Sequence, residues 1–295
     1  MTRERFLRRQ KRREGAMALL LLLCALTAVA LLGLVAAYLI LAGLPAIREI
    51  GLGPFLLGRT WDPAAGRFGI LPLLLASLYA TAGAVVIGVP AGFLTALFLA
   101  RAAPPRLAGL IRPAVDLLSG IPSVVVGLVG MTVLVPLLRE KLSLPAGDTL
   151  LAAVLVLAVM LLPPVIALSQ DALAAVPPAY EEGSLALGAT PAETWLRVTA
   201  PAAGRGLAAA AVLGVGRALG EATAVMMVAG NVANMPSLLS SVRLLTTGVA
   251  IEMNYAAPGS LHRQALFSIG LVLLVLVSLV NVVLTLALGR GRGAE

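Results

Sequence analysis

The sequence predicts an all-α membrane protein with six transmembrane helices, and three observations support this fold class. Of the 295 residues, 60% are hydrophobic and only 12% are charged. The mean hydropathy of +1.00 lies far outside the range of soluble globular proteins. Apolar runs of about 20 residues or more, the length that crosses a bilayer, recur along the chain between short polar segments.

The N-terminal segment combines a basic tail with a long apolar run. Residues 1–15 carry seven of the 22 basic residues, and residues 16–44 are much longer than the ~7–15-residue core of a signal peptide. We therefore expect an uncleaved first helix with a cytoplasmic N-terminus, because positive charge stays on that side. Residues 45–68 are expected to form an external loop, with Trp61 and Phe68 at the membrane interface.

Residues 69–288 contain five further apolar runs. We expect spans at about 70–100, from near 117, 149–169, 206–230 and 266–288. The segments that this order places inside carry fourteen basic residues and those outside carry seven, which agrees with the positive-inside rule. The prediction therefore places residues 289–295 in the cytoplasm and residues 231–264 outside, where a short helix is expected.

The fifth span holds two charged residues in an apolar run. Arg217 and Glu221 are four residues apart, so a continuous helix would place them on one face, about 6 Å apart along its axis. A charge at the centre of a membrane helix costs roughly 2.5–3.5 kcal/mol, so both should face the protein interior or a watery path and pair. We assign them to a solute pathway with Ser123 and Asn231; a structural ion pair is the alternative.

Small residues gather in two of the spans. Gly216 and Gly220 lie four residues apart beside the charged face, and Gly120, Gly127 and Gly130 recur in the third span. Residues of this size let a second helix approach closely. We expect helix contacts at these positions.

The amphiphilic stretch from Pro177 to Pro201 interrupts the apolar runs on the predicted cytoplasmic side. We expect two short helices joined at Gly188, with Pro201 marking the start of the next helix. An ordinary solvated connection between membrane helices is the alternative interpretation.

The residue inventory argues against an enzyme. Lys11 and Lys141 are the only lysines and neither follows glycine, so the chain has no phosphate-cradling Walker A loop. One cysteine, Cys24, and one histidine, His262, leave too few ligands for a structural zinc site. We predict no catalytic constellation, no metal and no cofactor, and we interpret the basic N-terminus as a topology signal rather than a nucleic-acid site.

The stretch that ends at Pro201 resembles the "EAA" loop of ABC-importer permeases. Glu182-Gly183-Ser184 stands where that family has Glu-Ala-Ala, Gly188 is the glycine that follows, and Ala200-Pro201 closes the loop. Gly and Ser remain small but lower the helix propensity. The resemblance implies that this cytoplasmic coupling segment, within 171–201, docks into a separate ATPase.

Four further runs, in order, resemble the PstC-type permease of the phosphate-specific ABC importer over residues 50–285. They are FGILPLLLASLYAT, SGIPSVVVGLVG, GVGRALGEATAVMMVAGN, and the ending formed by LLTTGVAIEMNYA and HRQALFSIGLVLLVLV. The resemblance implies a type I ABC-importer permease fold in the bacterial inner membrane and inorganic phosphate as the solute. It also implies a PstA-type second permease subunit, PstB-type ATPase subunits that bind ATP, and a PstS-type external phosphate-binding protein.

Three alternatives remain. A permease for sulfate, molybdate or another oxyanion would share the fold. A secondary transporter in which Glu221 carries a proton would need no ATPase and would leave the EAA-like loop without a purpose. A membrane-embedded enzyme or scaffold is disfavoured by the missing nucleophile and metal ligands.

Overall fold

The chain is almost entirely helical in a computed structural model that describes residues 2–289. The helices are α1 (Thr2–Ile50), α2 (Leu52–Leu57), α3 (Leu71–Leu97), α4 (Pro105–Gly120), α5 (Ser123–Val129), α6 (Val135–Lys141), α7 (Leu150–Ala174), α8 (Pro178–Ala186), α9 (Pro191–Thr194), α10 (Ala200–Ala202), α11 (Gly204–Gly220), α12 (Thr223–Val228), α13 (Leu245–Glu252) and α14 (Leu261–Gly289). Three π-helical turns, Phe98–Ala102, Gly130–Leu134 and Trp195–Thr199, adjoin them. A small hairpin pairs β1 (Trp61–Asp62) with β2 (Arg67–Phe68) around a 3-10 turn, Pro63–Ala65.

The predicted fold class is confirmed. Within residues 2–289, five helices are long and apolar enough to cross a membrane, and the count reaches six if a pair of helices bent by 70° is one span. That pair is Pro191–Ala202 and Gly204–Gly220. The tail assigned to residues 289–295 lies beyond the described residues, apart from Gly289.

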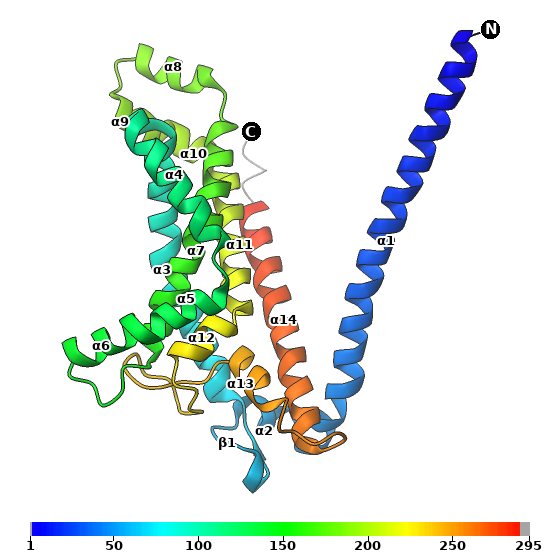
Figure 1. Cartoon of the computed structure of the whole chain (residues 1–295), viewed down its shortest axis with the longest axis vertical. Helices are drawn as coiled ribbons and strands as arrows, with labels where there is room; N and C mark the ends of the chain where they lie inside the picture. The colour runs from blue at the N-terminus through cyan, green and yellow to red at the C-terminus, as the bar shows by residue number, and fades with distance from the viewer. Residues whose placement is uncertain (1, 290–295) are drawn as a thin grey trace.

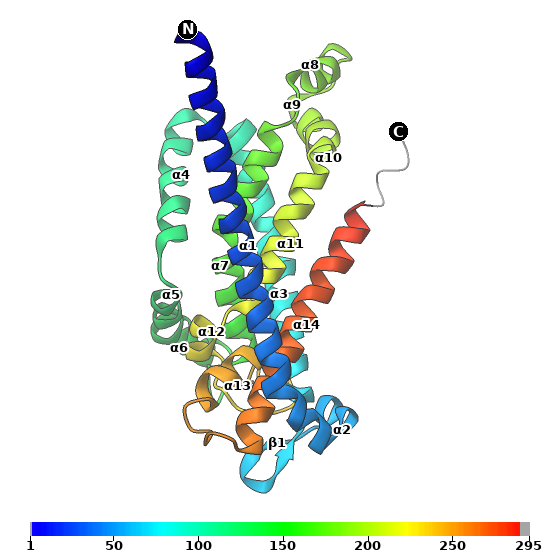
Figure 2. The same cartoon turned by 90° about the vertical axis from the view of Figure 1, so that its right-hand side faces the viewer.

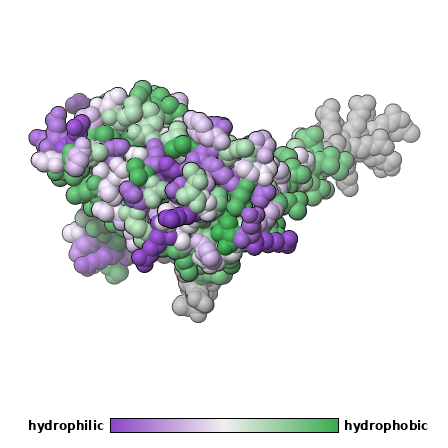
Figure 3. Space-filling model, turned by 90° about the horizontal axis from the view of Figure 1, so that it is seen from below, coloured by the Kyte–Doolittle hydropathy of each residue, from purple (hydrophilic) through white to green (hydrophobic). Residues whose placement is uncertain are grey.

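The two ends of the molecule differ (Figures 1 and 2). At one end lie the start of α1 and helices α8 to α10, and we call it the elbow end. At the other end lie α2, β1 and α13, and we call it the hairpin end. Figure 3 views the hairpin end and shows hydrophilic residues interspersed with hydrophobic ones.

Helices α3, α7 and α11 pack together at the centre of the bundle (Figure 1). Glycines of α3 allow the close approach to α7: a Cβ atom on Gly88 would lie 2.9 Å from the carbonyl oxygen of Ala158, and one on Gly92 would lie 2.8 Å from Val165 Cγ1. Membrane helices associate through such close packing, because lipid tails provide no hydrophobic drive between helices.

Helix α1 stands apart from the bundle and meets α14 near the hairpin end (Figure 1). A Cβ atom on Gly43 would lie 2.9 Å from the backbone nitrogen of Ser268, and the Ser268 hydroxyl donates to the Gly43 carbonyl at 2.6 Å. The expected end of the first helix at Leu44 is wrong, because α1 continues through Pro45. A proline removes one hydrogen bond, whereas Gly51, with φ +87°, takes the chain out of the helix.

The third span is also divided differently from the prediction. Residues 105–120 form helix α4 rather than a loop, and the stretch long and apolar enough to cross a membrane is Ser123–Lys141. Pro122 separates this stretch from α4, because the residue before a proline avoids helical angles, and Ile121 has ψ 125°. After the break, α5 lies against α12 and α6 projects from the side of the bundle (Figure 1). Gly127 and Gly130 make the expected close contacts, with Ala224 and Val228 of α12, whereas a Cβ atom on Gly120 would meet nothing within 4 Å, so the contact expected there is not made.

The hairpin end buries residues that we expected at the lipid interface. Trp61 and Phe68 are each 7% exposed, and their rings pack edge to face with centroids 5.8 Å apart. The segment therefore folds onto the protein instead of anchoring in the membrane. The short helix expected within 231–264 is confirmed as α13. The loop before it also caps α7, because the Ser240 carbonyl accepts from Leu150 N at 3.0 Å.

Candidate functional site

The fifth span breaks where its two charged residues lie. Helix α11 ends at Gly220, and Glu221 follows with an extended backbone, ψ 124°. Its carboxylate Oε1 accepts the backbone N–H groups of Thr223 at 3.1 Å and Ala224 at 3.2 Å, so it caps the first turn of α12. Its backbone carbonyl accepts the Thr246 hydroxyl at 2.9 Å. Contacts from α12 and α13 therefore satisfy the polar groups at this break.

Arg217 is exposed near the end of α11. It lines a small pocket between α4 and α7, together with Ser119 and Pro163. Pro163 has no N–H, so it cannot donate the usual helical hydrogen bond to the carbonyl of Val159, which also lines the pocket. Arg217 therefore shares a pocket of the bundle with Ser119, Val159 and Pro163. Ser119 was not singled out from the sequence, since a serine among apolar residues carries no distinguishing spacing.

The expected ion pair between Arg217 and Glu221 is absent among the described residues. The prediction assumed a continuous helix, and the break at Glu221 removes the shared face. The amide groups that open α12 take the place of the guanidinium as partners of the carboxylate. Arg217 is thus left without that counter-charge.

The other two pathway candidates lie at helix boundaries. Ser123 is the first residue of α5, directly after the break at Pro122, and is half-buried. Asn231 follows α12 with φ +57°, and its side-chain amide donates to the Met226 carbonyl at 2.6 Å. Its Oδ1 is buried and has no hydrogen-bond partner among the described residues.

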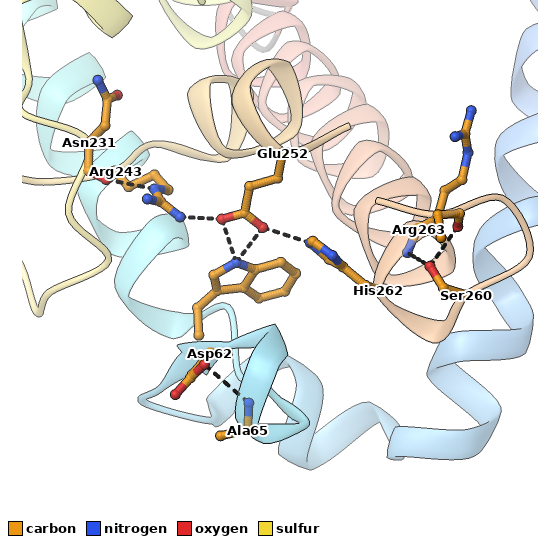
Figure 4. A network of polar contacts seen from close by, with 10 residues as sticks. Asp62, Ala65, Asn231, Arg243, Glu252, Ser260, His262 and Arg263 are labelled. Atoms are coloured by element: carbon orange, nitrogen blue, oxygen red, sulfur yellow. Dashed lines mark hydrogen bonds and ion pairs between the residues drawn. The ribbon is translucent and has the colours of Figure 1, made fainter. Parts of the chain in front are cut away.

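A polar network at the hairpin end was missed from the sequence (Figure 4). Glu252 accepts from the Trp61 indole at 3.0 and 2.9 Å, contacts His262 Nε2 at 2.8 Å, and pairs with Arg243. Arg243 also donates to the Asn231 carbonyl at 2.8 Å. The network ties β1, α13 and the start of α14 together. The only sign of this network in the sequence was one acidic residue, Glu252, in the apolar run of α13. Its partner Trp61 lies 191 positions away, so no sequence spacing links the two.

The segment from Pro177 to Pro201, which we call the elbow, has the helix–turn–helix form that was predicted. Helix α8 ends beside Gly188, whose φ of +88° favours glycine. Thr190 then caps α9 in a reciprocal capping box with Glu193. The bonds from the Thr190 backbone N–H and hydroxyl, at 3.0 and 2.8 Å, hold the pKa of the Glu193 carboxyl below its ordinary value.

Two of the three EAA-like residues lie on the open surface of α8, and the third faces α9. Glu182 and Gly183 are exposed, and a Cβ atom on Gly183 would meet nothing within 4 Å. Ser184 bonds to the Thr194 hydroxyl at 2.9 Å and joins α8 to α9. Nearby, Leu187 is 91% exposed. The elbow therefore presents small and apolar side chains that no described residue covers.

The expected start of the next helix at Pro201 is wrong. Pro201 lies in α10, which continues from the π-helical turn Trp195–Thr199, and α11 begins only at Gly204. In that turn the N–H of Ala200 bonds to the carbonyl of Trp195, five residues back. The wider turn accommodates a proline that lacks an N–H of its own.

The chain matches the family model "Binding-protein-dependent transport system inner membrane component" over residues 88–291. It is 43% identical over 201 residues to the probable ABC transporter permease protein YqgH of Bacillus subtilis, covering 68% of this chain and 65% of that protein. It is 36% identical over 221 residues to the phosphate transport system permease protein PstC of Haemophilus influenzae, covering 68% and 70%. The chain thus spans about two thirds of the length of these relatives.

The fold has a solved counterpart. A chain of the MetNI methionine ABC transporter, in an inward-facing conformation, superposes with a TM-score of 0.57 at 22% identity, covering 75% of this chain and 94% of that chain. At this identity the likeness concerns the fold, which is that of the type I ABC-importer permeases. The chain belongs to the family of inner membrane components of binding-protein-dependent transport systems.

Proposed function

We propose that this chain is the permease subunit of an ATP-driven phosphate importer, in which it forms half of the translocation path and couples that path to a separate ATPase. The observation that carries the proposal is Arg217, which is exposed, lines a pocket between α4 and α7 and is not paired with Glu221. The names of relatives such as the Haemophilus phosphate permease support the choice of solute.

The chemistry at Arg217 suits phosphate. A guanidinium offers fixed bidentate donors to an oxyanion and is less strongly hydrated than an ammonium. Because the Glu221 carboxylate is engaged by the α12 amides, it leaves the arginine available while lowering the local positive charge. A site of this kind binds the anion weakly enough to release it, which a transporter requires.

A second permease subunit, of the PstA type, would complete the path. A Cβ atom on Gly220 would meet nothing within 4 Å, and the nearest atom to one on Gly216 would be Asn281 Oδ1 at 3.9 Å. The close helix approach expected at these glycines is therefore not made within the described chain. The exposed apolar length of α1 is a second surface that a partner helix or lipid would cover.

The elbow is the proposed contact with the ATPase, of the PstB type. A short helix that enters a groove on another protein needs small residues for close backbone approach, which Gly183 supplies on the exposed face, while Ser184 holds α8 against α9. An exposed side chain such as Leu187 supplies apolar contact. ATP-driven closure of the ATPases would move the elbow and expose the path to alternate sides of the membrane. ATP itself would bind the partner, so this chain needs no cofactor.

The proposed location is the bacterial cytoplasmic membrane. Both termini and the elbow end would lie in the cytoplasm, in agreement with the excess of basic residues there. The hairpin end would face outward, where a PstS-type binding protein delivers the solute.

Uptake of radiolabelled phosphate tests this function. The chain is reconstituted in proteoliposomes with its second permease and ATPase, and the binding protein is supplied from outside. We expect uptake that requires ATP and resists excess sulfate or molybdate. Competition by either anion would favour another oxyanion as solute. Uptake driven by a proton gradient without ATP would favour the secondary transporter.

A further inference from the structure

One carboxylate at the elbow end joins three elements. Glu181 Oε1, in the first turn of α8, accepts from Arg101 Nε at 2.8 Å and from the Thr199 hydroxyl at 3.0 Å. Arg101 lies in the π-helical turn that follows α3, and Thr199 lies in the turn between α9 and α10. None of the three belongs to the EAA-like motif.

The arginine extends this junction to a fourth element. Its Nη2 donates to the carbonyl of Leu173, in the last turn of α7, at 3.1 Å. The Arg101 and Glu181 side chains are 23% and 22% exposed, and Thr199 is fully buried. One guanidinium therefore connects α8 with the ends of two central helices of the bundle.

Packing alone ties α8 weakly to those helices. Its close neighbours among the described residues are α9 and the turn Trp195–Thr199, which belong to the elbow itself. An open pocket of about 510 Å³ lies between the start of α8, the end of α7 and the start of α11, lined by Ala172, Val176, Tyr180, Pro201, Arg205 and Gly206 among others.

We propose that Arg101, Glu181 and Thr199 form a positioning clamp that transmits movement of the elbow to α3 and α7. The inference rests on the proposed coupling to an ATPase. With the clamp closed, a displacement of α8 carries the ends of both helices with it. Without the clamp, α8 moves over the pocket, and ATP is hydrolysed without opening the path.

The first test measures phosphate uptake and ATP hydrolysis together in the reconstituted importer. In Arg101→Gln and Glu181→Gln we expect uptake per ATP to fall by roughly tenfold, within the range typical of coupling between two sites, while hydrolysis continues. Arg106→Gln is the matched control, because Arg106 is exposed nearby and makes no side-chain hydrogen bond among the described residues. Unchanged uptake per ATP in both clamp variants, or an equal fall in the control, would overturn the proposal.

A covalent replacement separates transmission from a general structural role. In a Cys24→Ala background, cysteines at positions 101 and 181 should lower uptake per ATP as the single variants do. Joining them with a short bifunctional thiol reagent should restore coupling, and a reducible reagent should make the restoration reversible. A cross-link that forms without restoring uptake per ATP contradicts the clamp.

The last readout does not depend on the solute, so it separates failure of the clamp from failure of the proposed function. Spin labels on cysteines at Leu94 and Ala186, both exposed, report the distance between α3 and α8. We expect this distance to stay constant on ATP binding with the clamp intact and to change in Glu181→Gln. Equal behaviour of the two proteins would refute the clamp even if phosphate were transported; a wild-type complex that transports no phosphate refutes only the function.

Discussion

Removing the Glu252 carboxylate should release the hairpin from α13 and α14. In Glu252→Ala, Trp61 loses the acceptor of its indole N–H, and Arg243 and His262 lose their shared partner (Figure 4). A hydrogen bond to a charged group contributes about 1.5–3 kcal/mol. Trp61 is only 7% exposed, so loss of its hydrogen bond should cost the full amount. The side chains of Arg243 and His262 are partly solvated, so their contacts with Glu252 contribute less.

We estimate a total loss of about 3 kcal/mol for Glu252→Ala. Since each 1.4 kcal/mol is a factor of ten, local opening should become roughly 100-fold more frequent. Hydrogen exchange of residues 61–68 in the purified complex measures this opening. Glu252→Gln keeps an acceptor oxygen, so its exchange rate should lie between those of the wild type and Glu252→Ala.

Tyr255→Ala is the matched control for this measurement, because Tyr255 is 83% exposed and lies close to Glu252 in the chain. The rest of the bundle should keep its protection in all three variants. If the hairpin exchanges at the wild-type rate in Glu252→Ala, the network does not hold it, and packing of Trp61 and Phe68 suffices.

Three shorter predictions concern glycines and the elbow. Gly88→Leu should abolish assembly of the complex, measured by purification yield, because its Cβ alone would lie 2.9 Å from the Ala158 carbonyl oxygen. Gly188→Ala should strain the joint, where φ is +88°, by about 1 kcal/mol or more and lower uptake per ATP. Gly183→Ala should stabilise α8 by roughly 1 kcal/mol and leave uptake per ATP unchanged. The same uptake per ATP in both variants would contradict this prediction. The lowered pKa of Glu193 means that its contribution to the elbow is present above the ordinary value of 4.5 and is lost as pH falls through the lower folded value. Hydrogen exchange of residues 190–199 should show this acid dependence in the wild type and lose it in Glu193→Gln.

Long apolar runs predicted the membrane helices, because the thickness of the bilayer sets the length of apolar helix that crosses it. The elbow was also predictable, since Gly188 and Thr190 act on their own backbone. Local signals of this kind need no knowledge of the rest of the fold.

The breaks inside the membrane spans were not predictable in the same way. A proline tolerated at Pro45 and one that breaks the span at Pro122 look alike in sequence. The break at Glu221 depends on the Thr246 hydroxyl, 25 residues further along, and on the amides of α12. Tertiary hydrogen bonds therefore decide where an apolar run stops being a helix.

The break at Glu221 also changes what an exchange of the two charges should do. If Arg217 and Glu221 were a structural ion pair, the double variant Arg217→Glu with Glu221→Arg would largely restore a complex that each single variant destabilises. An arginine at position 221 has no acceptor for the N–H groups of Thr223 and Ala224, so the α12 cap would be lost. We therefore expect no rescue of either assembly or uptake.

The single variants separate the roles of the two residues. Arg217→Lys keeps the charge but loses the bidentate donors, so it should lower phosphate uptake while the complex assembles normally. Glu221→Gln keeps one acceptor oxygen for the α12 amides and should assemble, whereas Glu221→Ala leaves those amides uncapped, at a cost of about 1 kcal/mol, and should lower thermal stability. Uptake with radiolabelled phosphate and melting of the purified complex measure the two effects independently. Recovery of uptake by the charge exchange would show that the pairing forms in the assembled importer and that Arg217 acts through it rather than on the anion.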